Sequence, residues 1–246
     1  MSKVLILIPS RMSAKRLPGK PLLEINNLPI ISHVVNRGKE TRLGEVIVCT
    51  ENEEILFSVK KNGGQAILTG NQHKNGTERI YEGLQKLNKV EVDYIISLQG
   101  DEPAIDPLDI KSLFNLMIKN NCEIGTLASE IKHNSELNNA NVVKVETVEK
   151  LKKNNFPLAL NFSRNEPSQA NLNIYHHIGV YCYKVSILEK FVNLKETKNE
   201  KKNKLEQLRA MDNNININVA LAQSSPIGID TKEDYMALKK IMEYNS

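Results

Sequence analysis

The sequence of 246 residues has no tryptophan, few aromatic residues and little excess of either charge. Aromatic residues make up 5% of the chain, too few to suggest the stacking platforms on which single-stranded nucleic acids bind. The formal net charge is only +4, and the densest lysine run, residues 195–204, also contains Glu196 and Glu200. That mixture is typical of a solvated loop or helix face. The composition therefore argues against a nucleic-acid partner.

The sequence is also poor in cysteine and in long apolar runs. Cys49, Cys122 and Cys182 lie far apart, without the paired spacing of a zinc site, and their odd number argues against a disulfide framework. We expect free thiols in a reducing compartment. The apolar run at residues 4–8 is followed by Pro9 and is too short for a signal peptide or a membrane span. These features predict a cytoplasmic protein without a membrane partner.

The first hundred residues predict alternating strands and helices. Residues 4–8 form a continuous β-branched and leucine run, typical of a strand buried on both faces of a parallel sheet. The pattern continues with strands at 45–49, 66–68 and 93–98 and helices at 29–39, 53–61 and 78–87. Asn52 is a plausible cap of the second helix. This order predicts an α/β fold whose mostly parallel central sheet is flanked by helices.

The second half of the sequence is less regular, but nothing in it marks a linker. We expect helices at 107–119, 204–211 and 232–242, strands at 123–131, 142–146 and 175–183, and a polar loop at 165–173. With 40% hydrophobic residues the chain can bury one large core, so we predict a single domain over residues 1–246.

A basic loop at residues 9–21 leaves the first predicted strand at its carboxyl end, where doubly wound sheets bind ligands. It carries Arg11, Lys15, Arg16 and Lys20, and Gly19 allows the backbone to approach a ligand closely. Four cations in one such loop suit a polyanion such as a triphosphate. The loop lacks the glycines of a P-loop or a dinucleotide fingerprint. The alternative is an ordinary basic surface loop.

Two acidic residues are candidate metal ligands. Asp101 follows the fourth predicted strand and lies at the same sheet edge as the basic loop, and Mg²⁺ favours a few carboxylates together with phosphate oxygens. Its alternative role is to cap the next helix. Glu102 could also be the ligand, although its side chain is expected to point elsewhere. Asp230 precedes the last helix, and an N-cap role alone would account for it.

Further candidates lie at Asn75–Arg79 and around His177. The first stretch begins a helix, where backbone amides and Arg79 could meet an anion. His177, Gly179 and Tyr181 fall on one face of a strand, but an isolated histidine is more often structural, and no zinc-type spacing surrounds it. No serine or cysteine nucleophile has the glycines of a nucleophile elbow.

Seven stretches, in order, resemble the CMP-Kdo synthetases, or 3-deoxy-manno-octulosonate cytidylyltransferases, over nearly the whole chain. They are Ile8-Pro9-Ser10-Arg11 through Arg16-Leu17-Pro18-Gly19-Lys20-Pro21; Gly76-Thr77-Glu78-Arg79; Gln99-Gly100-Asp101-Glu102-Pro103; Phe162-Ser163-Arg164; His177-Ile178-Gly179-Val180-Tyr181; Leu205-Glu206-Gln207-Leu208-Arg209; and Gly228-Ile229-Asp230-Thr231.

The resemblance implies a Rossmann-like nucleotidyltransferase fold, usually a homodimer, whose N-terminal part binds CTP and whose C-terminal part binds the sugar and dimerises. It implies one reaction, in which CTP and the eight-carbon acid Kdo give CMP-Kdo and pyrophosphate for lipopolysaccharide biosynthesis in a Gram-negative bacterium. Mg²⁺ is the implied cofactor, held by Asp101 and Asp230.

The resemblance also assigns the remaining site residues. The implied catalytic set is Lys20, Arg11, Asp101 and Asp230. The implied nucleotide-binding residues are Pro9, Ser10, Arg11, Lys20, Gly76, Arg79, Gln99 and Asp101. The implied sugar-binding residues are Gln99, Arg164, His177, Tyr181, Glu206 and Gln207, with Arg164 a natural partner for the Kdo carboxylate.

The chain departs from the family pattern after Arg164, where Asn165-Glu166-Pro167 replaces the usual Ile-Pro and the loop to Asn173 looks shorter. This loop flanks the implied sugar pocket, so an amino-substituted analogue such as 8-amino-Kdo is an alternative substrate. A nucleotidyltransferase for sialic acid or a sugar phosphate is a second alternative. A catalytically inactive nucleotide-binding module is a third, although both implied metal carboxylates are present.

Overall fold

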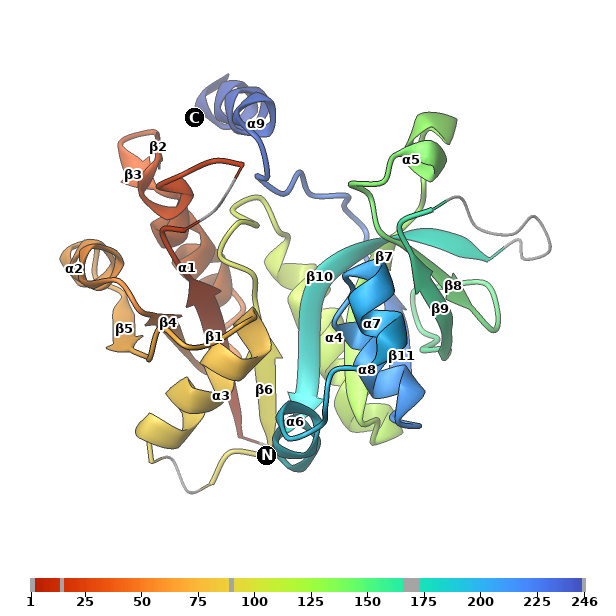
Figure 1. Ribbon diagram of the computed structural model, residues 1–246. Coiled ribbons are helices and arrows are strands. Elements are labelled where there is room, and N and C mark those ends of the chain that lie inside the picture. The colour runs from red at the N-terminus through yellow and green to blue at the C-terminus, as the bar shows by residue number, and fades with distance from the viewer. Residues whose placement is uncertain (1–2, 14–15, 89–90, 166–172, 245–246) are drawn as a thin grey trace. The chain divides into compact units, whose positions relative to one another are not determined.

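The computed structural model describes residues 3–13, 16–88, 91–165 and 173–244 (Figure 1). The chain divides into two compact units: unit 1, Met1–Pro107 with Pro226–Ser246, and unit 2, Leu108–Ser225. Each is described by itself. The expectation of a single domain, with a CTP-binding part and a sugar-binding and dimerisation part, stays a prediction.

Unit 1 is built on a parallel sheet in the order β6-β1-β4-β5. Its strands are β1 (Val4–Ser10), β4 (Glu45–Thr50), β5 (Gln65–Leu68) and β6 (Tyr94–Ser97). All seven residues of β1 are buried between β4 and β6, which explains why this strand is apolar on both faces.

Helices cover both faces of the unit 1 sheet. They are α1 (Ile30–Glu40), α2 (Glu53–Lys61) and α3 (Gly76–Lys86). A Cβ added to Gly38 of α1 would lie 2.9 Å from Val46, and one added to Gly83 of α3 would lie 2.3 Å from Cys49 Sγ. Val46 and Cys49 are three residues apart on β4 and so face opposite sides. The two glycines therefore let α1 and α3 pack closely on opposite faces.

The C-terminal segment returns to unit 1 and packs beside its N-terminal loops. A short 3₁₀ helix, η1 (Lys20–Leu22), and the hairpin of β2 (Glu24–Ile25) and β3 (Leu28–Pro29) lie near α9 (Lys232–Tyr244). Ile25, Ile30, Ile229 and Leu238 form a buried cluster. The Tyr235 hydroxyl donates to the Glu24 carbonyl at 2.7 Å. Burial of this cluster places residues 228–231 against the end of β6.

Unit 2 has a mixed sheet around β7 (Ile124–Ser129). This strand pairs in parallel with β11 (Ile217–Leu221) and antiparallel with β10 (Ile174–Lys184). β10 also pairs antiparallel with β8 (Lys144–Thr147), which pairs with β9 (Ala159–Ser163).

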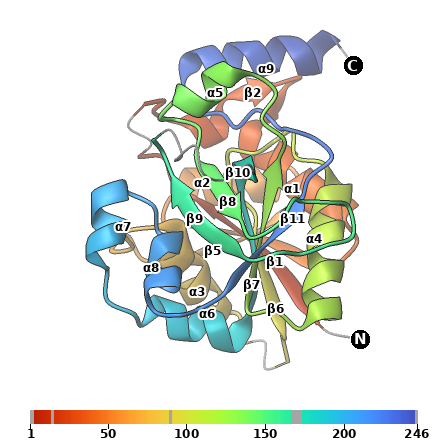
Figure 2. The ribbon, with the colours of Figure 1, turned by 90° about the vertical axis from the view of Figure 1, so that its right-hand side faces the viewer.

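The helices of unit 2 are α4 (Pro107–Asn120), α5 (Asn134–Asn138), α6 (Val185–Val192), α7 (Lys198–Asn203) and α8 (Gln207–Asp212). Figure 2 shows α4 on one side of β7 and β11 and α6, α7 and α8 on the other. A Cβ added to Gly125 of β7 would lie 2.6 Å from Met117 Sδ of α4. Gly125 therefore faces α4, and its neighbour Thr126 faces the opposite side.

The prediction of an α/β fold with a mostly parallel sheet flanked by helices is confirmed, and helix α2 has the predicted bounds. Strands β2, β3 and β9 and helices α5 and α6 are among the elements that were not predicted. Asn52 occupies the N-cap position of α2 as expected, but its side chain makes no cap and instead accepts from the Met12 amide at 2.9 Å. The predicted loop 165–173 lies, except for its two ends, outside the described residues.

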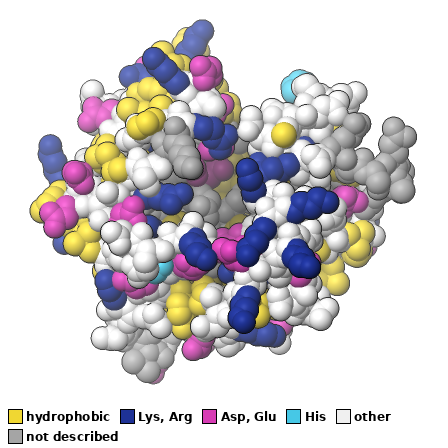
Figure 3. Space-filling model, in the orientation of Figure 1, with side chains coloured by type: hydrophobic (Ala, Val, Ile, Leu, Met, Phe, Trp, Pro, Cys, Tyr) yellow, Lys and Arg dark blue, Asp and Glu magenta, His cyan; other side chains and the backbone are white. Residues whose placement is uncertain are grey.

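On much of the face drawn in Figure 3, Lys and Arg side chains are interspersed with Asp and Glu. Within the described residues, no helix is long and apolar enough to cross a membrane. All three cysteines are free, and Cys49 and Cys182 are buried. Burial raises the pKa of Cys49 to about 12, which makes it an inert thiol.

Candidate active site

A cavity of about 590 Å³ opens in unit 1 at the carboxyl ends of β1 and β6. This is the edge at which parallel α/β sheets bind ligands, and the volume suits a nucleotide-sized molecule. It is lined by all eight residues predicted to bind the nucleotide and by the second predicted metal ligand: Pro9, Ser10, Arg11, Lys20, Gly76, Arg79, Gln99, Asp101 and Asp230.

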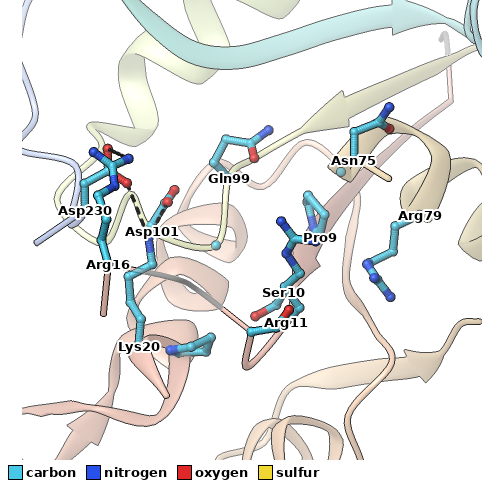
Figure 4. A pocket seen from close by; sticks show the side chains of 14 residues that line it. Pro9, Ser10, Arg11, Arg16, Lys20, Asn75, Arg79, Gln99, Asp101 and Asp230 are labelled. Atoms are coloured by element: carbon cyan, nitrogen blue, oxygen red, sulfur yellow. Dashed lines mark hydrogen bonds and ion pairs between the residues drawn. The ribbon is translucent and has the colours of Figure 1, made fainter. Parts of the chain in front are cut away.

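Four of the charged side chains that line this cavity lie at one end of it. Figure 4 shows Arg16, Lys20, Asp101 and Asp230 gathered there, while Asn75 and Arg79 lie at the other end. Pro9, Ser10, Arg11 and Gln99 lie between the two groups (Figure 4). The cavity thus offers separate places for a charged phosphate chain and for the rest of a nucleotide.

Two glycines allow the segments that line the cavity to pack closely against Pro9. A Cβ at Gly100 would lie 2.9 Å from the Pro9 carbonyl oxygen, and a Cβ at Gly76 would lie 3.0 Å from Pro9 Cγ. The end of β1 can therefore pack closely against the loop after β6 and the start of α3. Within the described residues the buried Ser10 Oγ has no hydrogen-bond partner, so a ligand in the cavity can use it.

Gly19 has a backbone role in the basic loop. Its φ is +72°, in the left-handed region that favours glycine, and a Cβ there would meet only Met12 Cε at 3.8 Å. Gly19 is therefore needed for the turn that begins η1, and its predicted role in close approach to a ligand stays a prediction. Lys15, one of the four cations predicted in this loop, lies outside the described residues.

Lys20 joins the two predicted metal ligands. Its Nζ donates to Asp101 Oδ2 at 2.7 Å and to the Ile229 carbonyl at 2.6 Å, and lies 3.7 Å from Asp230 Oδ1. Arg16 pairs with the other oxygen of Asp230 at 2.9 Å. Only 11% of the Lys20 side chain is exposed, so this ammonium is screened little by water.

The geometry decides between the two roles considered for Asp230. Thr231 caps α9, because its Oγ1 accepts from the Asp234 amide at 3.2 Å. The Asp234 carboxylate in turn accepts from the Asp230 and Thr231 amides at 3.1 and 2.8 Å. Asp230 is therefore not the cap, and its carboxylate faces Lys20 and Arg16. Asp101 is likewise not the cap of the next helix, since α4 begins only at Pro107, and its carboxylate accepts from Lys20.

The donor set of Asp101 and Asp230 fits Mg²⁺. Both carboxylates reach the same cation, Lys20 Nζ, although they are 129 positions apart in the sequence. Mg²⁺ is commonly held by one or two carboxylates, with phosphate oxygens and water completing its octahedron. Glu102 lies outside the lining of the cavity, with its Oε2 buried. Burial, aided by the charges of Asp101 and Asp230, raises the pKa of Glu102 and favours its neutral form.

Arg79 is bound to the protein itself. It is 2% exposed, and its guanidinium donates to Glu51 at 2.5 Å, to Thr69 Oγ1 at 2.8 Å and to the Gly70 carbonyl at 3.1 Å. Asn75 caps α3 by accepting from the Glu78 amide at 2.8 Å. Arg79 lines the cavity as predicted, but its charge is balanced by Glu51, so it shapes the loop before α3 more than it attracts an anion.

Unit 2 carries the other predicted sugar-binding residues, whereas Gln99 lies in unit 1. His177 and Tyr181 lie on β10 with ring centroids 5.5 Å apart. The pKa of Tyr181 is raised by burial and by its neighbours Tyr183 and Glu206, which places Glu206 near this phenol. Burial, and next the neighbouring His176, lower the pKa of His177 to about 3, so its imidazole is neutral at physiological pH.

Arg164 follows β9 and is half-buried. Its guanidinium donates to the Ala140 carbonyl at 3.1 Å. Its own carbonyl accepts from Lys144 Nζ at 2.7 Å, and Lys144 also donates to the carbonyls of Asn139 and Val142. Two cations therefore lie in one region of unit 2, where an acidic ligand would be favoured.

Glu206 and Gln207 are supported by a buried ion pair that the sequence analysis missed. Arg209 Nε and Nη2 donate to the two oxygens of Glu200 at 2.9 and 2.5 Å, and the guanidinium lies 5.1 Å from the Phe191 ring centroid. Glu200 is 8% exposed, although the mixed lysine run around it had suggested a solvated face. The signal available in the sequence was the capping-box pattern of Thr197 and Glu200, which indicates that Glu200 lies in the first turn of a helix and bonds to the protein.

Known proteins match this chain over almost its whole length. A family model described as Cytidylyltransferase matches residues 5–217. The 3-deoxy-manno-octulosonate cytidylyltransferase of Afipia carboxidovorans is 41% identical over 239 residues, covering 97% of this chain and 96% of that protein. The enzyme of the same name from Bartonella bacilliformis is 39% identical, covering 98% of each.

Solved structures show the same relationship. A CMP:2-keto-3-deoxy-manno-octonic acid synthetase complexed with CTP superposes with a TM-score of 0.90 at 34% identity, covering 100% of both chains. A UDP-glucose pyrophosphorylase complexed with UDP-glucose, with a TM-score of 0.75 at 17% identity, shares the fold alone. Because these matches span nearly its full length, the chain belongs to the 3-deoxy-manno-octulosonate cytidylyltransferase family.

Proposed function

We propose that this chain is a cytidylyltransferase that joins CTP to Kdo, giving CMP-Kdo and pyrophosphate. The observation that carries the proposal is the nucleotide cavity, which gathers Arg11, Lys20, Asp101 and Asp230 in a chain that matches a CTP-bound relative over its full length. In this reaction the anomeric hydroxyl of Kdo attacks the α-phosphorus in line, and pyrophosphate leaves. Such a transfer depends on positioning and on charge stabilisation.

The residues of unit 1 stabilise the leaving group. Arg11 and Lys20 offer charge-assisted donors to the phosphates, and Ser10 Oγ adds a neutral donor. Loss of one essential donor of this kind lowers the rate by roughly 10²–10³-fold. We propose that Asp101 and Asp230 hold Mg²⁺, which when bound supplies Lewis-acid polarisation of the α-phosphate. Lys20 then keeps both carboxylates oriented, because its Nζ lies close to each of them.

The residues of unit 2 select an acid sugar. We propose that Arg164, with Lys144 behind it, favours the Kdo carboxylate, while His177, Tyr181, Glu206 and Gln207 bind hydroxyl groups. Gln99, predicted to contact both substrates, lines the nucleotide cavity beside Pro9 and Gly76. A neutral His177 does not attract the carboxylate, so that task falls to Arg164.

The alternatives are less favoured. The relatives at about 40% identity carry the name of the Kdo enzyme. An inactive nucleotide-binding module is disfavoured because Lys20, Asp101 and Asp230 converge as an active site would need. Kdo activation serves lipopolysaccharide biosynthesis.

We further propose a homodimer in the cytoplasm. The dimer rests on the family resemblance. The cytoplasm is supported by three free cysteines, which a reducing compartment maintains, and by the supply of CTP there.

Pyrophosphate release from the purified protein tests the function, with Mg²⁺, each of the four nucleoside triphosphates, and Kdo present or absent. We expect release only with CTP and Kdo together. Release with CTP and a different acid sugar would keep the chemistry and change the substrate. No release from folded protein that binds CTP would favour the inactive module.

A further inference from the structure

Strand β10 is irregular where it carries the proposed sugar-binding residues. Its register against β7 pairs Ile178 with Leu127 and Tyr181 with Thr126, so Gly179 and Val180 have no opposite residue. This is a β-bulge, a feature that re-aims side chains and removes carbonyls from the regular ladder. His177 and Tyr181 stand on either side of it.

The Thr126 hydroxyl fills this bulge. Thr126 is fully buried, and its Oγ1 lies 2.8 Å from the Val180 carbonyl, 3.3 Å from the Ile178 carbonyl and 3.0 Å from His177 Nε2. A hydroxyl has one proton and two lone pairs. Both carbonyls can only accept, so the proton points to a carbonyl, and the shorter distance favours Val180.

This arrangement decides the tautomer of His177. Because the Thr126 proton is used on a carbonyl, His177 Nε2 must donate its own proton to Oγ1. The lone pair of the neutral ring then remains on Nδ1. If the Thr126 hydroxyl instead donated its proton to His177 Nε2, the Val180 carbonyl would lie 2.8 Å from Oγ1 without receiving a proton from it.

Packing also restricts the ring. Phe162 meets His177 edge to face at 5.1 Å, and Tyr181 lies at 5.5 Å on β10 itself. Burial holds the pKa of His177 near 3, so the ring does not gain a second proton at neutral pH. An imidazole held in one tautomer and one orientation is a directional hydrogen-bond acceptor.

We propose that Thr126 is a positioning residue for sugar recognition: its hydroxyl bridges the β10 bulge and holds His177 as the Nε2–H tautomer, so that Nδ1 accepts a hydrogen bond from a hydroxyl of the acid sugar. The sugar part of this inference rests on the proposed function. The tautomer part concerns the protein alone.

Two variants test the proposal. Thr126→Val keeps the shape of the side chain and removes the hydroxyl, whereas Thr126→Ser keeps the hydroxyl. We expect Thr126→Val to raise the KM for Kdo by roughly 10- to 100-fold, as for a lost hydrogen bond at a binding site, with the KM for CTP changed by less than about threefold. We expect Thr126→Ser to restore the KM for Kdo to within about threefold of the parent.

Nitrogen-15 NMR of the histidine side chains provides a readout that needs no substrate. In the parent protein His177 should show a protonated Nε2 and an unprotonated Nδ1, with His177→Gln identifying its signals. In Thr126→Val the signals should move toward a mixture of tautomers, and in Thr126→Ser they should not move.

The outcomes are separable. A parent protein with His177 protonated on Nδ1 would overturn the inference, whether or not the variants fold. So would a folded Thr126→Val protein with an unchanged KM for Kdo, or one in which the KM values for Kdo and CTP rise equally. Absence of turnover with CTP and Kdo in the parent would instead refute the proposed function and the sugar part, while the spectrum would still decide the tautomer.

Discussion

The proposed nucleotide cavity of unit 1 and the buried part of the proposed sugar-binding set of unit 2 differ in their electrostatics. In unit 1 the carboxylates of Asp101 and Asp230 are 34% and 47% exposed and are held by Lys20 and Arg16. In unit 2 His177 and Gln207 are less than 10% exposed, and His177 is neutral. Phosphates and a metal need formal charge, whereas sugar hydroxyls need directional neutral donors and acceptors.

The two sites also differ in the contacts that hold their side chains in place. The carboxylates of unit 1 arrive from segments far apart in the chain and are held together by ion pairs, since Lys20 contacts both and Arg16 contacts Asp230. In unit 2 the orientation depends on buried hydrogen bonds and aromatic packing around β10. Substitutions should therefore act on chemistry in the first unit and on sugar affinity or stability in the second.

The largest effect should come from Asp101→Asn. The change keeps the size of the side chain but removes a charge that the proposed metal needs, so turnover should fall by at least about 10³-fold while the fold is retained. Steady-state pyrophosphate release against Mg²⁺ concentration measures it. Asp93→Asn, a similar change just before β6, is the matched control and should be close to the parent. Near-normal activity of Asp101→Asn would remove Asp101 from the metal site.

The buried ion pair of unit 2 should have the next largest effect, on stability. Arg209→Met leaves Glu200 buried without its guanidinium and should cost about 3–5 kcal/mol of unfolding free energy. Urea denaturation measures it. Lys201→Met, on the same helix as Glu200 but 63% exposed, should cost about 0–1 kcal/mol. Adding Glu200→Gln to Arg209→Met should recover part of the loss; if it does not, the unpaired charge is not the cause.

A pair of arginine variants would sharpen the comparison between the units. Arg164→Ala should raise the KM for Kdo by roughly 10- to 100-fold and leave that for CTP nearly unchanged, because Arg164 is the proposed partner of the Kdo carboxylate. Arg11→Ala, in the nucleotide cavity, should raise the KM for CTP more than that for Kdo and also lower the turnover number. Initial rates with each substrate varied in turn measure both. Equal shifts in the two KM values for either variant would contradict the proposed division of labour.

The smallest effect should be a pH dependence of stability in unit 1. Burial acts to raise the pKa of Glu82, but hydrogen bonds from Lys86, His73 and the Gly70 amide lower it from 4.5 to about 2. The folded protein holds this carboxylate charged where the unfolded chain would bind a proton. The stabilisation is therefore present above pH 4.5 and is lost as the pH falls toward 2.

Glu82→Gln should flatten the fall in stability over this pH range, as measured by denaturant unfolding at several pH values. Glu149→Gln, at an exposed position, serves as the control and should keep the parent profile. A Glu82→Gln protein with the parent profile would show that other groups cause the acid loss.

The sequence alone predicted the parallel sheet of unit 1, because strands buried on both faces must be apolar throughout, as β1 is. It also predicted that the basic loop and Asp101 would lie at one edge of the sheet, because loops that leave the carboxyl ends of parallel strands meet there. Other cavity residues, such as Gly76 and Gln99, were implied by the family resemblance. The order of motifs identified the family, which the comparisons confirm.

Only the tertiary structure decided the roles that depend on long-range contacts. Asp230 could have been a helix cap until burial of Ile229 and Leu238 placed it beside Lys20 and left the cap to Thr231. Glu200 lies in a lysine-rich run, yet Arg209 draws it into the interior. Thr126 carries no local signal, because a threonine in a strand is ordinary, and its role arises from a bulge in a strand about fifty residues away. Periodicity and motif spacing describe neighbours along the chain, whereas these three roles come from partners that only folding brings together.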